Sequence, residues 1–151
     1  MADISDELIT YLKTVAGVTA IVGTTTSARI YNQDGPPQGV LNPTQAGNTR
    51  GAVCIVKQQD ENTGYMGGRS VLNKATFAIT SYAVTPTDRN TLGAAIWAAL
   101  APEVTQTMGS TAIAEIVTIN KGSDGDYPAS DATDQRLYVS QAAYSIWYYT
   151  A

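Results

Sequence analysis

The hydrophobic pattern of the chain changes its period within residues 77–101. Residues 77–82 alternate between two faces, the period of two that indicates a strand with one buried face. After Thr85, apolar residues recur three and four positions apart, which predicts a helix over 86–101. Thr85 suits the N-cap, Pro86 the first helical position and Asp88 the first turn. The predicted core stripe of this helix is Leu92, Ala95, Ile96, Ala99 and Leu100.

The same patterns place the other elements. Residues 3–16 read as an amphipathic helix that we expect Gly17 to end, and residues 18–23 are compatible with a further short turn. The expected strands cover residues 28–32, 52–61, 69–84, 110–122 and 134–150. This order, α-β-β-β-α-β-β, predicts one α+β domain over residues 1–151. We expect a mostly antiparallel sheet of four to five strands, with two helices packed on one face.

Three connections are rich in turn-forming or polar residues. The 32–51 segment holds three prolines and several glycines and reads as a long loop. "DENTGYMGG" at 60–68, with Tyr65 and Met66, reads as the tip of a β-hairpin. The 122–135 segment is an acidic loop between the last two strands. Each connection is either an ordinary exposed loop or a docking device for a partner.

Composition removes several function classes. The net charge is −4 and the Lys and Arg residues occur singly, so we expect no tight binding of nucleic acid. Histidine is absent, which removes the commonest general base and metal ligand. The single cysteine, Cys54, lies in an apolar run and reads as a core residue. No apolar run approaches the ~20 residues that span a bilayer, and the N-terminus lacks a signal-peptide pattern.

The sequence contains no convincing metal-binding, nucleotide-binding or catalytic motif. Residues 124–135 carry four acids, but an EF-hand loop needs Gly at its sixth position and Glu at its twelfth, where Ala129 and Gln135 stand. "GYMGGRS" lacks the lysine of a phosphate-binding loop, and a Ser-His-Asp triad is excluded without histidine. We therefore expect no enzyme, no cofactor and no metal site.

Aromatic residues gather at the C-terminus, where five of the chain's twelve lie within the last fourteen residues. Both faces of the 134–150 strand are substantially apolar, so it is either a central covered strand or a strand that meets another subunit. The 86–101 helix is also apolar beyond its core stripe. We infer that the domain packs against copies of itself. The predicted contact residues are Tyr65, Met66, Trp97, Trp147, Tyr148 and Tyr149.

The order of these patterns resembles the tail-completion, or tail-terminator, proteins of tailed bacteriophages. The residues concerned are "VAGVTAIVG", "RIYNQDGPPQG", "AVCIVKQQ", the glycine pair of "YMGG", and "ATFAITSYAVTPTDRNTLGAAIWAAL" with the two strands that follow. The resemblance runs over nearly the whole chain, although none of these stretches is a stringent motif. The long loop containing "PPQGVLNPTQAGNTR" departs from the family, which goes more directly into its strand.

The resemblance implies a structural virion protein of the phage neck, assembled in the host cytoplasm. Such proteins form a ring, typically a homohexamer, that caps the head-proximal end of the tail tube and stops its polymerisation. The implied partners are copies of the chain itself, the tail tube protein and the head–tail connector or stopper protein. DNA would pass through the lumen without specific binding, and no membrane is involved.

Two other readings stay open. The first is a head-completion adaptor or a minor tail-tube protein, which is also an assembly role. The second is a small-molecule or glycan-binding module, which predicts a monomer with a concave aromatic site.

Overall fold

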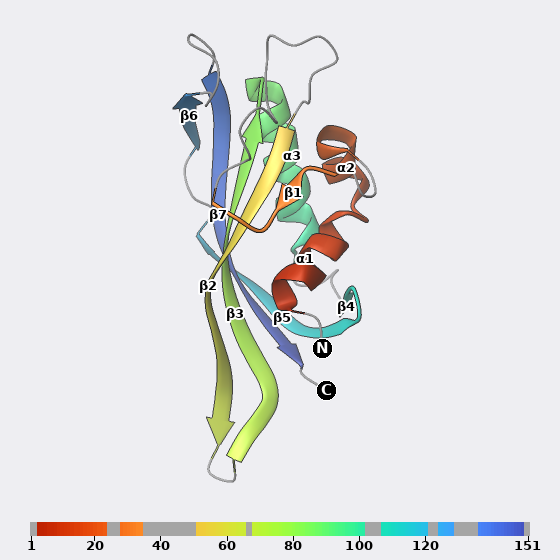
Figure 1. Cartoon of the computed structure of the whole chain (residues 1–151), viewed down its shortest axis with the longest axis vertical. Helices are drawn as coiled ribbons and strands as arrows, with labels where there is room; N and C mark the ends of the chain where they lie inside the picture. The colour runs from red at the N-terminus through yellow and green to blue at the C-terminus, as the bar shows by residue number, and fades with distance from the viewer. Residues whose placement is uncertain are drawn as a thin grey trace.

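The computed structural model describes residues 3–23, 28–34, 51–65, 68–101, 107–120, 124–128 and 136–149. Within these ranges the chain is an α+β domain in which three helices lie on one face of a curled, seven-stranded sheet (Figure 1). The strand order is β1-β2-β3-β7-β5-β4, with β6 also paired to β7. Every pair is antiparallel except β1 with β2. The expected class and the one-sided helices are confirmed; the strand and helix numbers were too low.

The N-terminal helix is two helices, α1 (Ile4–Leu12) and α2 (Ala16–Val22). At the break, the Thr14 hydroxyl donates to the carbonyl of Tyr11 over 2.6 Å, a local hydrogen bond that competes with continued helix. Gly17 does not end a helix, because it lies inside α2. A Cβ at this position would stand 3.0 Å from the Ala95 Cβ, so the glycine permits close packing of α2 against α3.

The two long central strands form the expected hairpin. Strand β2 (Gly51–Tyr65) pairs with β3 (Gly68–Ala83) along almost their full length. A bulge between Lys57 and Gln59 shifts the register of β2. Lys57 and Asp60 are three residues apart and would lie on opposite faces of a regular strand, but because of the bulge both face the helices. Since β7 pairs with β3 only from Leu72 onward, the end of the hairpin projects as a two-stranded arm (Figure 1).

The strand-to-helix join forms as expected. Helix α3 (Pro86–Ala99) begins with Pro86 in its first turn, and the Thr85 hydroxyl accepts the backbone N–H of Asp88 over 3.1 Å. Its buried stripe holds Leu92, Ile96 and Ala99, three of the five predicted core residues, and Leu100 is buried just beyond its end. Ala95 is partly buried against the same core.

The remaining strands complete the sheet. Strand β7 (Arg136–Tyr149) is central, between β3 and β5 (Thr111–Asn120). Three short strands add edges: β1 (Ile30–Tyr31), β4 (Thr107–Met108) and β6 (Asp124–Pro128). Strand β6 corrects the prediction of an uninterrupted acidic loop at 122–135. The backbone of β7 before Ala143 is not paired by β5, and β6 supplies its hydrogen bonds there.

The sheet has two unlike faces. The inner face packs on the helices, and its fully buried side chains include Phe77, Tyr144 and Ile146. The outer face carries a small cluster around Ala52, Cys54 and Tyr82. Cys54 is 2% exposed, which confirms it as a core residue.

Candidate functional site

Large apolar side chains reach the surface at two places. Among the described residues, Trp97 is 44% exposed on α3, and Val117, Ile119 and Tyr149 are 40%, 54% and 46% exposed on β5 and β7. Single exposed apolar residues need no explanation, but a tryptophan on a helix of alanine and glycine is a favoured anchor for a partner.

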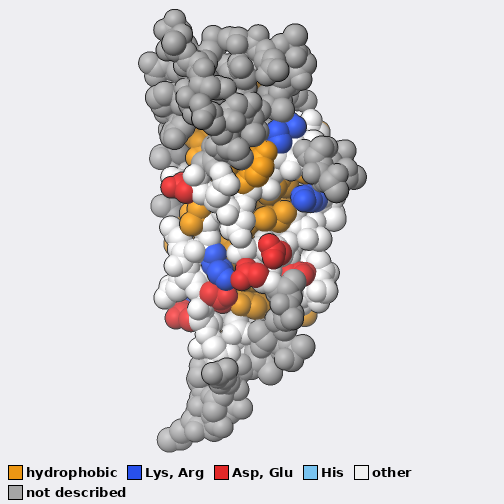
Figure 2. Space-filling model, viewed as in Figure 1, with side chains coloured by type: hydrophobic (Ala, Val, Ile, Leu, Met, Phe, Trp, Pro, Cys, Tyr) orange, Lys and Arg blue, Asp and Glu red, His pale blue; other side chains and the backbone are white. Residues whose placement is uncertain are grey.

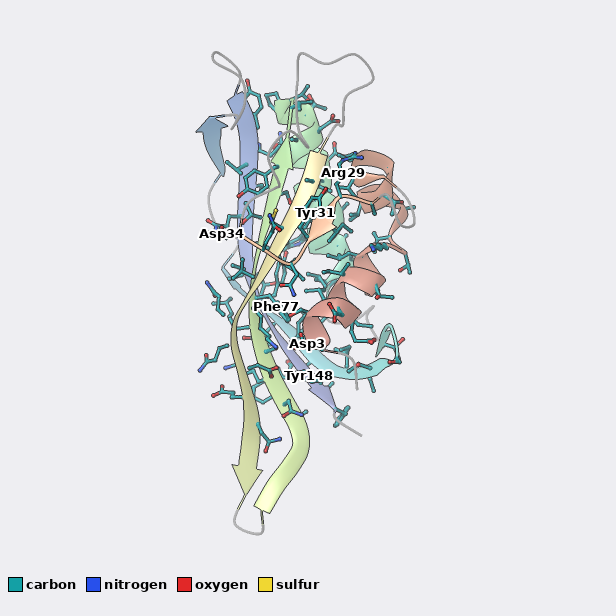
Figure 3. The ribbon with its side chains drawn as sticks, in the orientation of Figure 1. Asp3, Arg29, Tyr31, Asp34, Phe77 and Tyr148 are labelled. Atoms are coloured by element: carbon teal, nitrogen blue, oxygen red, sulfur yellow. The ribbon has the colours of Figure 1, made fainter. Side chains whose placement is uncertain are left out.

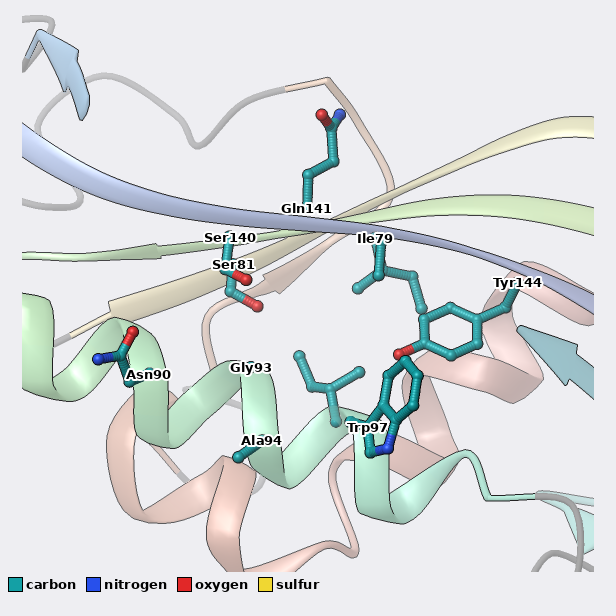
Figure 4. Close-up of a pocket in the computed structure, with 11 residues that line it drawn as sticks. Ile79, Ser81, Asn90, Gly93, Ala94, Trp97, Ser140, Gln141 and Tyr144 are labelled. Atoms are coloured by element: carbon teal, nitrogen blue, oxygen red, sulfur yellow. The ribbon is translucent and has the colours of Figure 1, made fainter. Parts of the chain in front are cut away.

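The six predicted contact residues do not form one surface. Trp97 lies on α3, on the helix side of the sheet (Figure 4). Trp147 lies on the outer face, half-buried, with the Lys74 ammonium 5.5 Å from its ring centroid. Tyr149 lies on the same outer face, as the alternation along β7 requires. The side chain of Tyr65, at the end of the arm, and the whole of Met66 lie outside the described residues.

Tyr148 occupies a different environment from its neighbours. It faces inward, is 6% exposed, and its hydroxyl donates to Asp60 over 2.7 Å. Burial and the neighbouring carboxylates raise the pKa of this phenol well above its ordinary value. Tyr148 therefore lies inside the domain, whereas its neighbours Trp147 and Tyr149 lie on the outer face of the sheet.

A small charged network connects this tyrosine to the N-terminal helix. The Lys57 ammonium lies 2.8 Å from Asp3 and 3.2 Å from Asp60. The hydrogen bond from Lys57 is the main reason that the pKa of Asp3 is lowered. Figure 3 labels Asp3 and Tyr148 beside each other below α1, and Figure 2 shows acidic side chains gathered on this face. The network attaches α1 to the sheet where the arm begins.

A cleft of about 320 Å³ lies between α3 and the inner face of β3 and β7 (Figure 4). Its helical wall is a stripe at positions 90, 93, 94 and 97, separate from the core stripe of α3. The volume falls within the range of small-ligand or side-chain pockets. The lining residues are Ile79, Ser81, Asn90, Gly93, Ala94, Ile96, Trp97, Ser140, Gln141, Ala142 and Tyr144. None of them carries a formal charge.

Two side chains that carry hydroxyl groups line this cleft, Ser81 at 2% exposed and Tyr144 at 1%. Among the described residues no buried side-chain nitrogen or oxygen lacks a hydrogen-bond partner. Figure 4 shows Ser81 pointing toward α3 and the Tyr144 hydroxyl pointing toward Trp97. Burial raises the pKa of Tyr144 to about 12, so the phenol stays protonated and can donate a hydrogen bond. The cleft thus offers apolar walls with polar groups at its base.

The raised pKa of Tyr144 predicts a loss of stability in alkali. Because the folded state holds this pKa at about 12 against an ordinary 10, its contribution is complete below pH 10 and is lost as pH rises toward 12. At pH 11 we expect wild type to have lost about 1.4 kcal/mol more than Tyr144→Phe, relative to pH 8. Urea unfolding of both proteins at the two pH values measures this. Parallel losses would show that the phenol is not held neutral by burial.

The described residues contain no group of three or more Cys, Asp or Glu side chains that could hold a metal ion. Across those same ranges, no helix has both the length and the apolar character to cross a membrane.

The arrangement around the cleft suits recognition of an uncharged group by shape and hydrogen bonding.

Sequence reasoning identified Trp97 and its small neighbours but did not find the cleft. Two signals were present: the stripe at 90, 93, 94 and 97, and a serine at position 81 between the apolar residues Ile79 and Ala83 in the inward row of β3. Neither signal shows that Ser140 of β7 lies opposite Ser81, which follows from the strand register.

Comparison with known proteins shows a shared fold and no family match. Neither a protein-family model nor a curated protein matches the chain. Among solved structures, it resembles a chain described as "Virion of native gene transfer agent (GTA) particle", with a TM-score of 0.58 and 12% sequence identity. The superposition covers 93% of this chain and 91% of that chain. The likeness at this identity shows a shared fold along nearly the whole length of both.

Proposed function

We propose that this protein is a structural component of a phage-like virion and that it acts as a tail terminator. Copies would form a ring, hexameric as in the resembling family, on the head-proximal end of the tail tube. The ring would stop tube growth by covering the complementary surface on which the next layer adds, and would present a different surface to the connector protein. Its function would be to bind partners, without catalysis.

One observation carries this proposal: the fold is shared end to end with a chain of a virion particle. The tail-terminator role in particular is supported by the resemblance of the sequence patterns described above. Self-association is supported by the exposed side chains Trp97, Ile119 and Tyr149, because aromatic and aliphatic anchors of this kind are enriched in subunit contacts.

The test is the mass of the purified protein in solution, combined with negative-stain imaging and with addition of preformed tail tubes. We expect closed rings of about six copies, either free or on one end of each tube. A head-to-tail contact between copies gives such a ring when the rotation from one copy to the next closes the assembly. Stacked layers of this protein alone would indicate a tube protein, and rings bound to portals but never to tubes would indicate a head-completion adaptor. A monomer that ignores tubes would refute the proposal.

Trp97→Asp should impair ring formation more than folding. Because the side chain is 44% exposed, we expect the free energy of unfolding to fall by only about 1 kcal/mol, while self-association weakens at least about tenfold. Sedimentation and urea unfolding measure the two effects separately. Ala98→Asp, which adds the same charge at another exposed position of α3, is the matched control. Outright unfolding of the tryptophan variant would show that Trp97 belongs to the core.

A further inference from the structure

We propose that Lys57 couples the first turn of α1 to the base of the β2–β3 arm, so that loosening either element loosens the other. The inference concerns the isolated protomer and does not depend on the proposed function. Its starting point is an unbroken series of hydrogen bonds that runs from α1 across the sheet to β7. The groups, in order, are the backbone N–H of Ser5, Asp3, Lys57, Asp60 and the hydroxyl of Tyr148.

The helix end of this series depends on one carboxylate. Asp3 is the N-cap of α1, and its Oδ1 accepts the backbone N–H of Ser5 over 2.7 Å. Its Oδ2 accepts a hydrogen bond from the Lys57 ammonium over 2.8 Å. That bond is the largest cause both of the lowered pKa of Asp3 and of the raised pKa of Lys57. The two oxygens of one side chain therefore join the cap of α1 to strand β2.

The sheet end uses a second carboxylate in the same way. Asp60 accepts the Lys57 ammonium over 3.2 Å with Oδ2 and the Tyr148 hydroxyl over 2.7 Å with Oδ1. The Cα of Asp60 pairs with that of Ala75 in β3, the strand between β2 and β7. The pairing of β3 with β7 ends at Leu72, shortly beyond Ala75, and the arm continues from there as two strands. Asp60 is thus bonded to β7 at the base of the arm.

Lys57 is the connecting member of the series. Among the described residues it is the one side chain that contacts both carboxylates. The side chains of Lys57, Asp3 and Asp60 are 26%, 48% and 30% exposed, so water screens both ion pairs and each is weak. Weak pairs of this kind can open while the domain stays folded, as local coupling requires.

The coupling has to act in both directions. By thermodynamic linkage, a partner that holds the arm in its bonded position would also stabilise the first turn of α1. A partner that holds α1 would equally steady the arm. A contact made at one element is therefore detectable at the other, through a series of named hydrogen bonds.

The test uses substitutions that separate the helix cap from the coupling. Asp3→Ala removes both bonds of the carboxylate, whereas Asp3→Asn keeps a good N-cap and loses the ion pair with Lys57. Lys57→Met keeps the aliphatic stem and removes the ammonium. Lys13→Met makes the same change at the C-cap of α1 and is the matched control. Circular dichroism during thermal unfolding verifies that each variant is folded.

Amide hydrogen exchange, measured by NMR on the folded proteins, gives the readout at Ser5 and at residues 72–75 of β3. At 72–75 we expect Asp3→Asn and Asp3→Ala to accelerate exchange alike, by roughly threefold, and Lys57→Met at least as much. At Ser5, Asp3→Ala should exceed the other two variants, because it alone loses the cap. Adding Asp3→Asn to Lys57→Met should cause no further acceleration at either place, since both remove the same bond. Lys13→Met should match wild type at 72–75.

Three results would overturn the inference. Wild-type exchange at 72–75 in both Asp3 variants would show that α1 does not act on the arm. Additive effects of Asp3→Asn and Lys57→Met would show two independent contacts. Acceleration at 72–75 by Lys13→Met of the same size would assign the effect to a general loosening of α1. The tail-terminator role is tested separately by ring formation and tube binding, so it can stand or fail independently of this coupling.

Discussion

Phe77→Ala is expected to lower the free energy of unfolding by about 3–5 kcal/mol. Phe77 is the only phenylalanine of the chain, is completely buried, and lies on the inner face of β3, where its Cα pairs with that of Tyr144 in β7. Truncation removes the ring from the main core and leaves a cavity that two long, hydrogen-bonded strands cannot easily collapse. Since domains of this kind are stable by only about 5–15 kcal/mol, a large share of the total would be lost.

Urea unfolding followed by circular dichroism measures the effect. Thr76→Ala, one position earlier and facing outward from the same strand, should cost only about 1 kcal/mol, because its hydroxyl lies 3.4 Å from that of Ser145. Phe77→Leu should fall between the two because it retains most of the buried volume. Equal losses in Phe77→Ala and Thr76→Ala would contradict the assignment of the inner face as the principal core.

Gly109→Ala is expected to cost about 2.5–5 kcal/mol, from two sources that can be separated. Gly109 has a φ of 55°, in the left-handed region where a side chain costs about 1–2 kcal/mol. An added Cβ would also overlap the carboxylate of Glu7, which is 7% exposed and accepts the Ser110 N–H over 2.5 Å. Displacing this carboxylate loses a charge-assisted hydrogen bond that fixes α1 to the β4–β5 turn, about 1.5–3 kcal/mol.

The two sources differ in their response to further substitutions. Asn tolerates the left-handed region, so Gly109→Asn should retain the steric loss and relieve part of the backbone loss. In a Glu7→Ala background, Gly109→Ala should cost only the backbone part, and the double-mutant cycle should show coupling of at least about 1 kcal/mol. Additive effects in that cycle, measured by urea unfolding, would mean that Glu7 and Gly109 do not meet.

The elements with strong local signals were predictable. The N-cap at Thr85, the proline at the start of α3 and the alternation of β3 each depend on residues close in sequence, and each formed as expected. The break between α1 and α2 was missed because Thr14 can either extend a helix or bond back to Tyr11. Strands β4 and β6 were missed because two and five residues carry too little pattern to indicate pairing.

The candidate site was predictable only in part. The apolar character of α3 beyond its core stripe was visible in the sequence, and Trp97 is 44% exposed there. Its contact with a partner stays a prediction. The burial of Tyr148 was not visible, because an aromatic strand with two apolar faces gives no sign of which face meets the helices. Its bond to Asp60 depends on the bulge in β2, which changes the face that Asp60 occupies.

The sequence by itself determined the class of this protein: an α+β chain with a hairpin, a capped helix and two further long strands, and with no histidine. These properties follow from local periodicity, capping chemistry and composition. The tertiary structure decided which serines face which helix, that Gly17 permits packing against Ala95, and that Tyr144 and Ser81 share one cleft. Those relations join residues far apart in the chain, and they are fixed by strand register and close packing, which no local pattern records.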